Sequence, residues 1–142
     1  MQFKYKFKIA KVISKLQINF LDNNVILLYH SVINDNLINQ FSRIENISKS
    51  KFDQQCNFLK KNFKNRITKV SKNTSKKGSI SISFDDGKKN IITNVFPIIE
   101  KYEIPITVFI CPELVGKENY LNIEDIKFLK LSGLVEIGAH GY

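Results

Sequence analysis

Four short apolar runs, each bounded by polar residues or glycine, have the length and composition of buried β-strands. The first covers residues 25–32 (VILLYHSV) and the last covers residues 134–137. Residues 79–84 alternate serine with isoleucine or phenylalanine, which is the two-residue period of a strand. Residues 106–111 are rich in β-branched and aromatic side chains. The pattern therefore predicts four main strands, and a shorter one is expected near residues 67–70.

Segments with helical spacing lie between these strands. The first helix is expected to begin within residues 48–50, where a serine can cap it. Its apolar stripe recurs at steps of four, three and four: Phe52, Cys56, Leu59 and Phe63. A second helix is expected over residues 89–102, with Pro97 kinking or restarting it. A third is expected over residues 123–132, with Asn122 as its cap.

The order of these elements indicates an α/β fold. Alternating strands and helices are typical of parallel strands joined by right-handed helical crossovers. Residues 33–49 are polar and rich in asparagine, and are expected to form a long loop. The last expected strand ends close to Tyr142, so its outgoing helix is missing from the 142 residues.

The amino-acid composition and net charge limit the kinds of binding partner that are expected. With 142 residues, of which 43% are hydrophobic and 25% charged, the chain has the balance of one ordinary globular domain. Its formal net charge of +9 favours acidic partners such as nucleic acid or anionic lipid. Most of the excess is lysine, however, and arginine, which suits phosphates and base edges better, occurs only at Arg43 and Arg66. No nucleic-acid partner is therefore expected.

Other signals exclude further classes. Residues 1–24 form a basic segment whose apolar residues are interrupted by lysine, without the continuous apolar centre and cleavage site of a signal peptide. This segment could make peripheral contact with an anionic membrane as an amphipathic helix, although packing against the domain edge is favoured. No apolar run reaches about 18 residues, so no transmembrane segment is expected. Cys56 and Cys111 have no metal-binding or redox spacing and are expected to be core residues.

Ionisable side chains follow three of the expected strands. Asp85 and Asp86 come directly after residues 79–84, His140 follows the last strand, and His30 lies at the end of the first. Because parallel strands deliver their carboxyl ends to one edge of a sheet, these residues are expected to converge. A mixture of carboxylate and imidazole suits Zn²⁺ or a similar divalent metal. Adjacent carboxylates can also divide the roles of metal ligand and base.

Each of these residues also has a simpler interpretation. Asp-Asp-Gly after a strand is by itself a common turn, because aspartate accepts turn hydrogen bonds and glycine adopts positive φ. His140 can be a surface histidine, and His30 a buried histidine bonded to the backbone. The metal-site hypothesis becomes as favoured as these alternatives only because the aspartates and histidines are expected to converge at one edge of the sheet.

Several ordered motifs between residues 25 and 142 resemble the polysaccharide deacetylase (NodB-homology) family, carbohydrate esterase family 4. They are SFDDG preceded by ISI, VFPIIEKYEIPITVFI with its proline-bearing helix, and the GAH that follows the strand VEI. VILLYHSV and the Phe-x-x-Gln of residues 52–55 resemble the N-terminal part of the family's secreted and cell-envelope branch. The resemblance implies that residues 25–142 form a partial, distorted (β/α) barrel of the NodB-homology type whose C-terminal strands are missing.

The resemblance also implies an activity, which is metal-dependent hydrolysis of N-acetyl groups from the amino sugars of a polysaccharide or oligosaccharide. On the matched motifs, Asp85 is the general base, Asp86 is a metal ligand, and His140 is the first histidine of a His-x-x-x-His metal pair. His30 receives no catalytic role but is expected to line the site. The metal, Zn²⁺ or alternatively Co²⁺ or Ni²⁺, would polarise the acetamide carbonyl and lower the pKa of its bound water.

Parts of the family's pattern have no counterpart in the 142 residues. The second histidine of the pair would fall at position 144, and the Arg-Pro-Pro-type, later Asp-containing and Leu-x-x-His motifs would also lie after Tyr142. Lys88 follows FDDG where the family commonly has an aromatic residue or proline. Two metal ligands are fewer than the three that catalytic zinc normally takes from protein. A truncated N-terminal portion that is inactive or nearly so is therefore expected.

Two other functions stay open. A non-catalytic glycan-binding or regulatory remnant would keep the edge of the site without its chemistry, and a basic nucleic-acid-binding module is less favoured. Localisation is open as well. The absence of a legible export signal favours a cytoplasmic or membrane-peripheral protein, whereas the family branch works mostly at the cell envelope.

Overall fold

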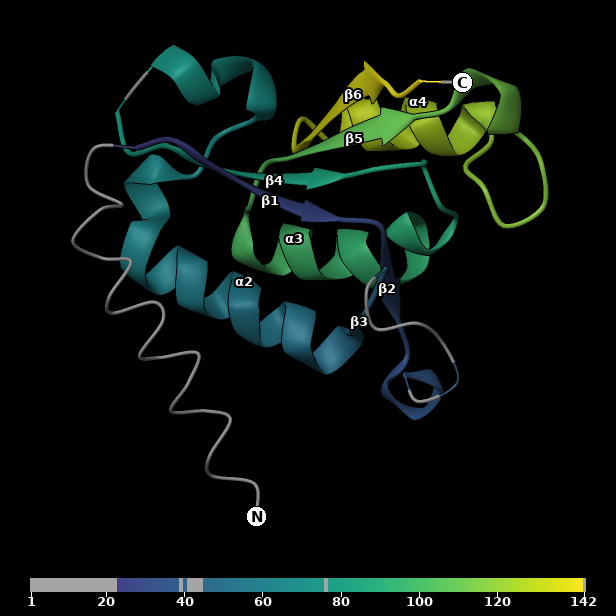
Figure 1. Cartoon of the computed structure of the whole chain (residues 1–142), viewed down its shortest axis with the longest axis horizontal. Helices are drawn as coiled ribbons and strands as arrows, with labels where there is room; N and C mark the ends of the chain where they lie inside the picture. Colours follow the sequence, from purple (N-terminus) through teal and green to yellow (C-terminus); the bar gives the residue numbers. More distant parts are fainter. Residues whose placement is uncertain (1–22, 39, 41–44, 76, 142) are drawn as a thin grey trace.

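The computed structural model describes residues 23–38, 40, 45–75 and 77–141 (Figure 1). Nearly all of the basic segment 1–24 lies outside the described residues, and with it both its favoured packing against the domain edge and the alternative contact with a membrane surface. Among the residues that are described, no helix is long and apolar enough to cross a membrane.

A four-stranded sheet in the order β1-β4-β5-β6 forms the centre of the structure (Figure 1). Its strands are β1 (Val25–Tyr29), β4 (Ile80–Phe84), β5 (Ile106–Ile110) and β6 (Val135–Ala139). All three pairings are parallel, so each connection must cross back over the sheet. Helices supply these crossovers, which confirms the predicted α/β class. Both edges of the sheet, β1 and β6, are unpaired within the described part of the chain.

In the described part of the chain, three α-helices pack on this sheet. α2 (Lys49–Phe63) and α3 (Phe96–Tyr102) contact each other and lie along the sheet beneath β1 and β4 in the view of Figure 1, and α4 (Ile123–Leu131) packs against β6. As predicted, a serine caps α2, because Ser48 Oγ accepts a hydrogen bond from the amide of Lys51 at 3.4 Å. α4 begins with a capping box between Asn122 and Asp125.

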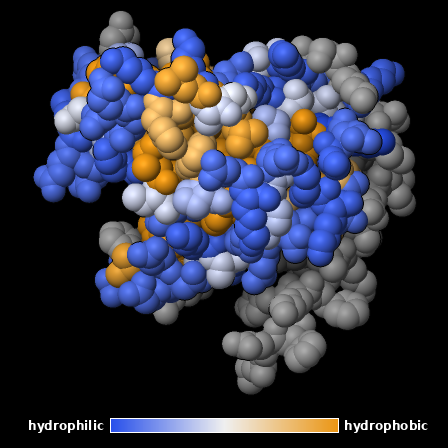
Figure 2. All heavy atoms as spheres, turned by 180° about the vertical axis from the view of Figure 1, so that it is seen from behind, coloured by the Kyte–Doolittle hydropathy of each residue, from blue (hydrophilic) through white to orange (hydrophobic). Residues whose placement is uncertain are grey.

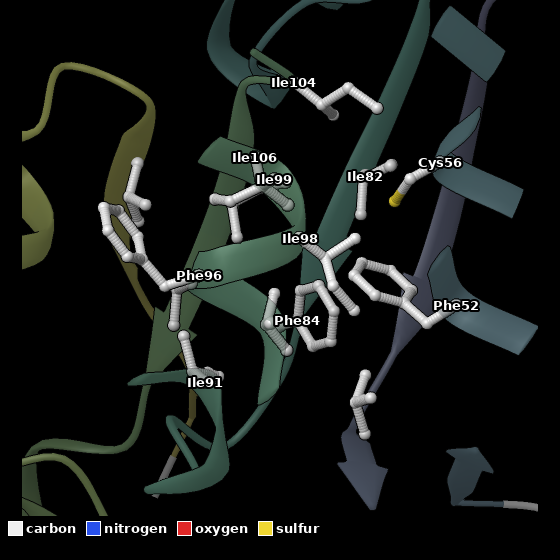
Figure 3. Packing of buried hydrophobic residues seen from close by; sticks show 14 of the residues in the cluster. Phe52, Cys56, Ile82, Phe84, Ile91, Phe96, Ile98, Ile99, Ile104 and Ile106 are labelled. Carbon is white, nitrogen blue, oxygen red and sulfur yellow. The ribbon is translucent and has the colours of Figure 1, made fainter. Parts of the chain in front are cut away.

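The core lies between the sheet and helices α2 and α3 (Figure 3). The ring of Phe84, the last residue of β4, stacks on Tyr29 at a centroid distance of 5.3 Å and meets Phe52 of α2 edge-on at 5.6 Å. Cys56 of α2 points into the same cluster, where burial and then the nearby Asp53 carboxylate raise the pKa of its thiol to about 12. Cys56 and Cys111 are both buried and free, as expected for core residues.

The segment predicted as one helix over residues 89–102 forms two helical pieces. A π-helical turn covers Ile91–Val95, and α3 follows directly with Pro97 in its first turn. The missing N–H of proline removes no helical hydrogen bond at that position. Asn94 of the π-helical turn donates to the carbonyl of Val32 at 2.8 Å. The second piece begins at Phe96, next to the proline at which a kink or restart was predicted.

Two predictions for the connections were wrong. The apolar run 25–32 divides at His30, and Ser31–Ile33 (β2) pairs with Asn46–Ser48 (β3) in a small parallel sheet inside what was predicted to be a loop. The strand expected near residues 67–70 is a single bridge from Ile67 to Ile80, after which the chain turns into a 3₁₀ helix. Strands this short leave no two-residue period in the sequence, so their pairing depends on tertiary contacts.

That 3₁₀ segment, Val70–Ser75, ties the four central strands together on the sheet face that carries the serines of β4. Asn73 donates to Ser81 Oγ of β4 at 2.8 Å and to a carbonyl of β1 at 3.1 Å. The first backbone amide of the segment donates to Thr107 Oγ1 of β5 at 2.9 Å, and the next residue contacts Glu136 of β6 through its amide and its hydroxyl. These polar contacts explain why Ser81 and Thr107 are buried.

Among the described residues, large apolar side chains are exposed on three elements. They are Ile26 and Leu28 on β1, Phe58 on α2, and Ile123, Phe128 and Leu131 on α4. Figure 2 shows apolar atoms gathered in one area of an otherwise mostly hydrophilic face. Contiguous exposed apolar surface is unusual on a soluble domain and marks places where other structure can pack.

Candidate active site

Backbone hydrogen bonds between neighbouring strands place two of the predicted site residues at one edge of the sheet. Asp85 follows β4, and its amide donates to the carbonyl of Tyr29 at the end of β1, at 3.0 Å. His140 follows β6, and its amide donates to the carbonyl of Ile110 at the end of β5, at 2.8 Å. Since β5 lies between β4 and β6, the two residues approach each other across its end.

The side chains of Asp85 and His140 are in contact. His140 Nε2 lies 3.3 Å from Asp85 Oδ2, and the side chains are 37% and 16% exposed, respectively. An imidazole and a carboxylate at this separation form an ion pair when the histidine is protonated. The predicted convergence of these two residues is therefore present in the fold.

Asp86 follows Asp85 with a left-handed backbone. Asp86 and Gly87 have φ angles of 68° and 66°, a conformation that glycine adopts freely and aspartate tolerates. A Cβ atom on Gly87 would lie 2.9 Å from Cγ2 of Ile110, so the turn also passes too close to β5 for a side chain. The Asp-Asp-Gly motif is thus a tight turn that presents its two carboxylates in different directions.

Asp86 has a lysine as its neighbour. Lys88 Nζ lies 3.6 Å from Asp86 Oδ2 and donates to the hydroxyl of Tyr120 at 2.9 Å, while sitting 4.5 Å from the centroid of the same ring. Burial alone would lower the pKa of Lys88, but the contacts with Tyr120 and Asp86 outweigh it and the pKa is raised. These contacts therefore favour the charged form of Lys88 beside Asp86.

A close approach between β5 and β6 brings His140 to its place. Gly138 is paired with Phe109, and a Cβ atom on Gly138 would lie 2.6 Å from two atoms of the Phe109 ring. The absence of a side chain at Gly138 leaves room for the Phe109 ring in this position. The glycine of the Gly-Ala-His motif therefore sets the position of the strand end that carries the histidine.

The side chains of the site are of the types that bind a divalent metal, but there are fewer of them than a metal site needs. Asp86 supplies a carboxylate and His140 an imidazole, both ordinary ligands of zinc and similar ions. Within the described ranges, however, no group of three or more His, Cys, Asp or Glu side chains could hold a metal ion. His30 lies between β1 and β2, next to the Tyr29 carbonyl that accepts from Asp85. It is thus at the predicted edge, and its part in lining the site stays a prediction.

Tyr120 is a residue of the site that the sequence pattern did not reveal. It lies in the connection between β5 and α4, which returns to the Asp-Asp-Gly turn and pairs with it through the backbone, with the Leu121 amide donating to Gly87 at 2.9 Å. The only local signal was the unusual Lys88. Nothing in the sequence indicates which residue 32 positions later would hold it.

Comparisons with known proteins point to one family. A family model described as polysaccharide deacetylase matches residues 72–142, which is half of the chain. The chain is 31% identical over 148 aligned residues to a poly-beta-1,6-N-acetyl-D-glucosamine N-deacetylase of Staphylococcus aureus, covering 89% of this chain and 51% of the relative. It thus spans about half the length of the curated relatives that it matches.

Solved structures show the same fold. IcaB from Ammonifex degensii superposes with a TM-score of 0.70 and 26% identity, over 84% of this chain and 53% of that one. A polysaccharide deacetylase from Bacillus cereus superposes with a TM-score of 0.68 and 24% identity, over 84% of this chain and 39% of that one. The fold is therefore the predicted partial NodB-homology fold, present over about half of the IcaB structure.

Proposed function

The chain belongs to the polysaccharide deacetylase family, and from this premise we propose that it carries the Asp-Asp and first-histidine portion of an active site for N-deacetylation of an amino-sugar polymer. The observation that carries the proposal is the contact of 3.3 Å between Asp85 and His140 across the end of β5, with Asp86 in the adjoining turn. Residues 25–142 would be the incomplete catalytic domain, and residues 1–24 a separate basic segment.

In the proposed reaction, Asp85 acts as the general base. Its carboxylate is the less exposed of the pair and accepts a proton from the water that adds to the acetamide carbonyl carbon. The proton taken up by Asp85 is then transferred to the nitrogen as the C–N bond breaks, so the free amine leaves, the Asp85 carboxylate is restored and the acid formed ionises to acetate. His140, whose Nε2 lies 3.3 Å from Asp85 Oδ2, orients the carboxylate of Asp85 and would offer an imidazole nitrogen to a bound metal.

Asp86 and His140 would hold a divalent metal, with Zn²⁺ favoured over Co²⁺ or Ni²⁺. The metal would supply Lewis-acid polarisation of the carbonyl and a bound water of lowered pKa. Catalytic zinc normally takes three protein ligands, and the described residues offer no such group. We therefore propose that the 142-residue chain alone is inactive or nearly so.

The substrate class follows from the relatives. The staphylococcal proteins are named for poly-beta-1,6-N-acetyl-D-glucosamine, so that polymer is the first substrate to test for this chain. A polymer of N-acetylated amino sugars supplies the acetamide that the proposed chemistry requires. The protein would act at the cell envelope, as the secreted and cell-envelope branch of the family does.

The test uses a hybrid in which residues 25–142 replace the matching half of the Staphylococcus aureus relative. Acetate release from poly-beta-1,6-N-acetyl-D-glucosamine is measured for the hybrid, for the 142-residue chain and for each after removal of metal by a chelator. We expect activity from the hybrid that the chelator abolishes, and none from the chain alone. Circular dichroism checks that the hybrid folds.

A matched pair of substitutions isolates the proposed base. Asp85→Asn in the hybrid should lower the rate by about a hundredfold or more, because a positioned base contributes on that order. Asp53→Asn is the control, since Asp53 lies on α2 and pairs with Lys101 at the surface. Full activity of the Asp85→Asn hybrid would contradict the assignment of the base, and acetate release by the chain alone would contradict the proposed inactivity. Glycan binding without hydrolysis by a folded hybrid would favour the non-catalytic function.

A further inference from the structure

Basic residues are concentrated in one part of the chain. Residues 49–77 contain ten lysine and arginine residues and one acidic residue, Asp53. Residues 78–142, which carry Asp85 and His140, contain six basic and nine acidic residues. The positive charge of the protein therefore comes mainly from the segment between the start of α2 and the start of β4, whereas the part that carries the candidate site is net acidic.

The end of this basic segment lies at one edge of the sheet, which we call the amino edge because the parallel strands begin there. α2 ends at Phe63, and the bridge from Ile67 to Ile80 then brings the chain next to the start of β4. Lys77 lies three residues before β4. Because Asp85 and His140 follow the other ends of their strands, the amino edge and the candidate site lie at opposite ends of the sheet (Figure 1).

Several basic side chains of the amino edge face solvent. Lys61, Lys64 and Lys77 are exposed, and none of the ion pairs in the described part of the chain involves them. Lys60 differs, because it pairs with Glu103 at 3.0 Å. A lysine in the last turn of a helix is favoured by the helix dipole alone. This explanation does not extend to Lys77, which lies outside the helices.

An aromatic side chain accompanies these charges. Phe58 is exposed and precedes Lys61 by three residues, so the two are neighbours on the surface of α2. The centroid of its ring lies 6.0 Å from that of Phe63. Lysine combined with exposed phenylalanine is typical of helices that lie on a lipid surface. Sites for nucleic acid rely more on arginine, of which residues 49–77 contain only Arg66.

The basic N-terminal segment joins the fold at the same edge. The amide of Val25, the first residue of β1, donates to the carbonyl of Ser79 at 2.8 Å, and the side chain of Asn24 accepts from the amide of Ser79 at 3.1 Å. Residues 1–22, which precede this point, contain five lysines and one acidic residue. Their charge has the same sign as that of the amino edge to which they connect.

We propose that the amino edge docks on a membrane surface rich in anionic phospholipid, with the candidate site turned away from the lipid. The docking surface consists of Phe58, Lys61, Lys64, Arg66 and Lys77. Its basic side chains would lie at the headgroup phosphates, and the Phe58 ring would lie at the boundary with the acyl chains. An anionic surface attracts the basic end of the molecule and repels the acidic end, which sets the orientation. The proposal does not depend on the catalytic roles proposed above.

The test measures how much of the 142-residue chain sediments with vesicles. Vesicles of phosphatidylcholine and phosphatidylglycerol are compared with vesicles of phosphatidylcholine alone, at an ionic strength of about 0.1 M, where the Debye length is about 10 Å. We expect binding to the anionic vesicles only. The binding should be lost at about 1 M salt, because the Debye length then falls to about 3 Å.

Two double variants with the same change in net charge locate the binding surface. Each lysine near an anionic membrane contributes about fivefold to binding, so Lys61→Gln with Lys64→Gln should bind about 25-fold more weakly. Lys89→Gln with Lys117→Gln is the control, because both residues follow strand ends at the opposite edge of the sheet. Strands of five residues are about 17 Å long, which exceeds the Debye length, so the control should lose about twofold or less.

The orientation is measured with a polarity-sensitive fluorophore on a single introduced cysteine. Asn65→Cys places it at the amino edge and Glu118→Cys places it in the connection after β5, and both positions are exposed. Cys56 and Cys111 are buried, so the introduced thiol is labelled preferentially. We expect the emission of the label at position 65 to shift to shorter wavelength on binding to anionic vesicles, and that of the label at position 118 to stay unchanged.

Several results would overturn the proposal. They are equal binding to neutral and anionic vesicles, equal losses in the two double variants, and a shift of the label at position 118 alone. Unchanged binding of the Lys61→Gln, Lys64→Gln variant would also overturn it, because residues 1–24 alone would then hold the membrane. Tighter binding to a short DNA duplex than to anionic vesicles at equal salt would replace the lipid by nucleic acid. Lys61→Gln with Lys77→Gln is measured in parallel, so that a folding defect of one variant does not decide the result.

Discussion

Substitution of Gly138 by alanine tests how the site is built. The added Cβ would lie 2.6 Å from atoms Cδ1 and Cε1 of Phe109, well inside van der Waals contact. The ring or the end of β6 must therefore move. Because His140 follows two residues later and contacts Asp85 at 3.3 Å, a displaced strand end would also disturb the site.

Two terms set the expected loss of stability. Forcing a methyl group into a filled position usually costs about 1–3 kcal/mol. Replacing glycine also removes conformational freedom from the unfolded chain, which stabilises by about 0.4–1 kcal/mol. Phe109 is only half-buried, so part of the clash is relieved by rotation of the ring. The net expectation is a loss of about 1–2 kcal/mol in the free energy of unfolding.

Urea unfolding followed by far-UV circular dichroism measures this loss, since the chain has no tryptophan to report by fluorescence. Gly141→Ala is the matched control on the other side of His140. A Cβ at Gly141 meets nothing within 4 Å, so that variant should be neutral or slightly stabilised. The double variant Gly138→Ala with Phe109→Ala should recover part of the loss, because the clashing ring is gone.

Equal stability of the Gly138→Ala and Gly141→Ala variants would refute the reasoning, and so would strictly additive effects in the double variant. Either result would mean that the close approach of β6 to Phe109 does not constrain the fold. The imidazole signal of His140 gives a second measurement, which should shift in Gly138→Ala and stay unchanged in Gly141→Ala.

Two further predictions concern the core and the polar contacts around the sheet. Phe52→Ala should lower the free energy of unfolding, measured with urea, by about 3–5 kcal/mol, because the Phe52 ring is fully buried against two other rings. Phe58→Ala, on the exposed face of the same helix, should lower it by about 1 kcal/mol or less. Similar losses in the two variants would contradict this difference in burial. Burial alone would raise the pKa of Glu136, but hydrogen bonds from Ser71 and Thr107 outweigh this effect and the pKa is lowered. The Glu136 carboxylate therefore stabilises the fold above the ordinary glutamate pKa, and this stabilisation is lost as the pH falls through the lowered pKa. The stability gap between wild type and Glu136→Gln should therefore shrink in acid, and a gap that is independent of pH would contradict this account.

Local chemistry of the chain was sufficient to predict the main elements. The apolar stripe from Phe52 predicted α2, its serine cap was found at Ser48, and α3 begins next to Pro97, where a kink or restart was predicted. These features depend on neighbours within four residues, through side-chain periodicity, capping and the fixed φ of proline. For the same reason, the Asp-Asp-Gly turn was predictable from its residue types.

The alternating serines of β4 show where such reasoning ends. Their period predicted the strand, but burial of Ser81 depends on Asn73, which reaches it from a 3₁₀ segment that begins where the sequence pattern had suggested a strand. The small sheet of β2 and β3 escaped prediction for a related reason. Three-residue strands carry too few positions to show a period, and their pairing is decided by contacts distant in sequence.

The candidate site divides in the same way. The sequence by itself determined that Asp85, Asp86 and His140 follow parallel strands, because strand ends and turn residues are local features. Only the tertiary structure decided which partners they meet: His140 faces Asp85 across β5, and Lys88, fixed by Tyr120, faces Asp86. Strand order and the return of a long connection are set by packing of the whole domain, so side chains far apart in the sequence become neighbours without any local signal.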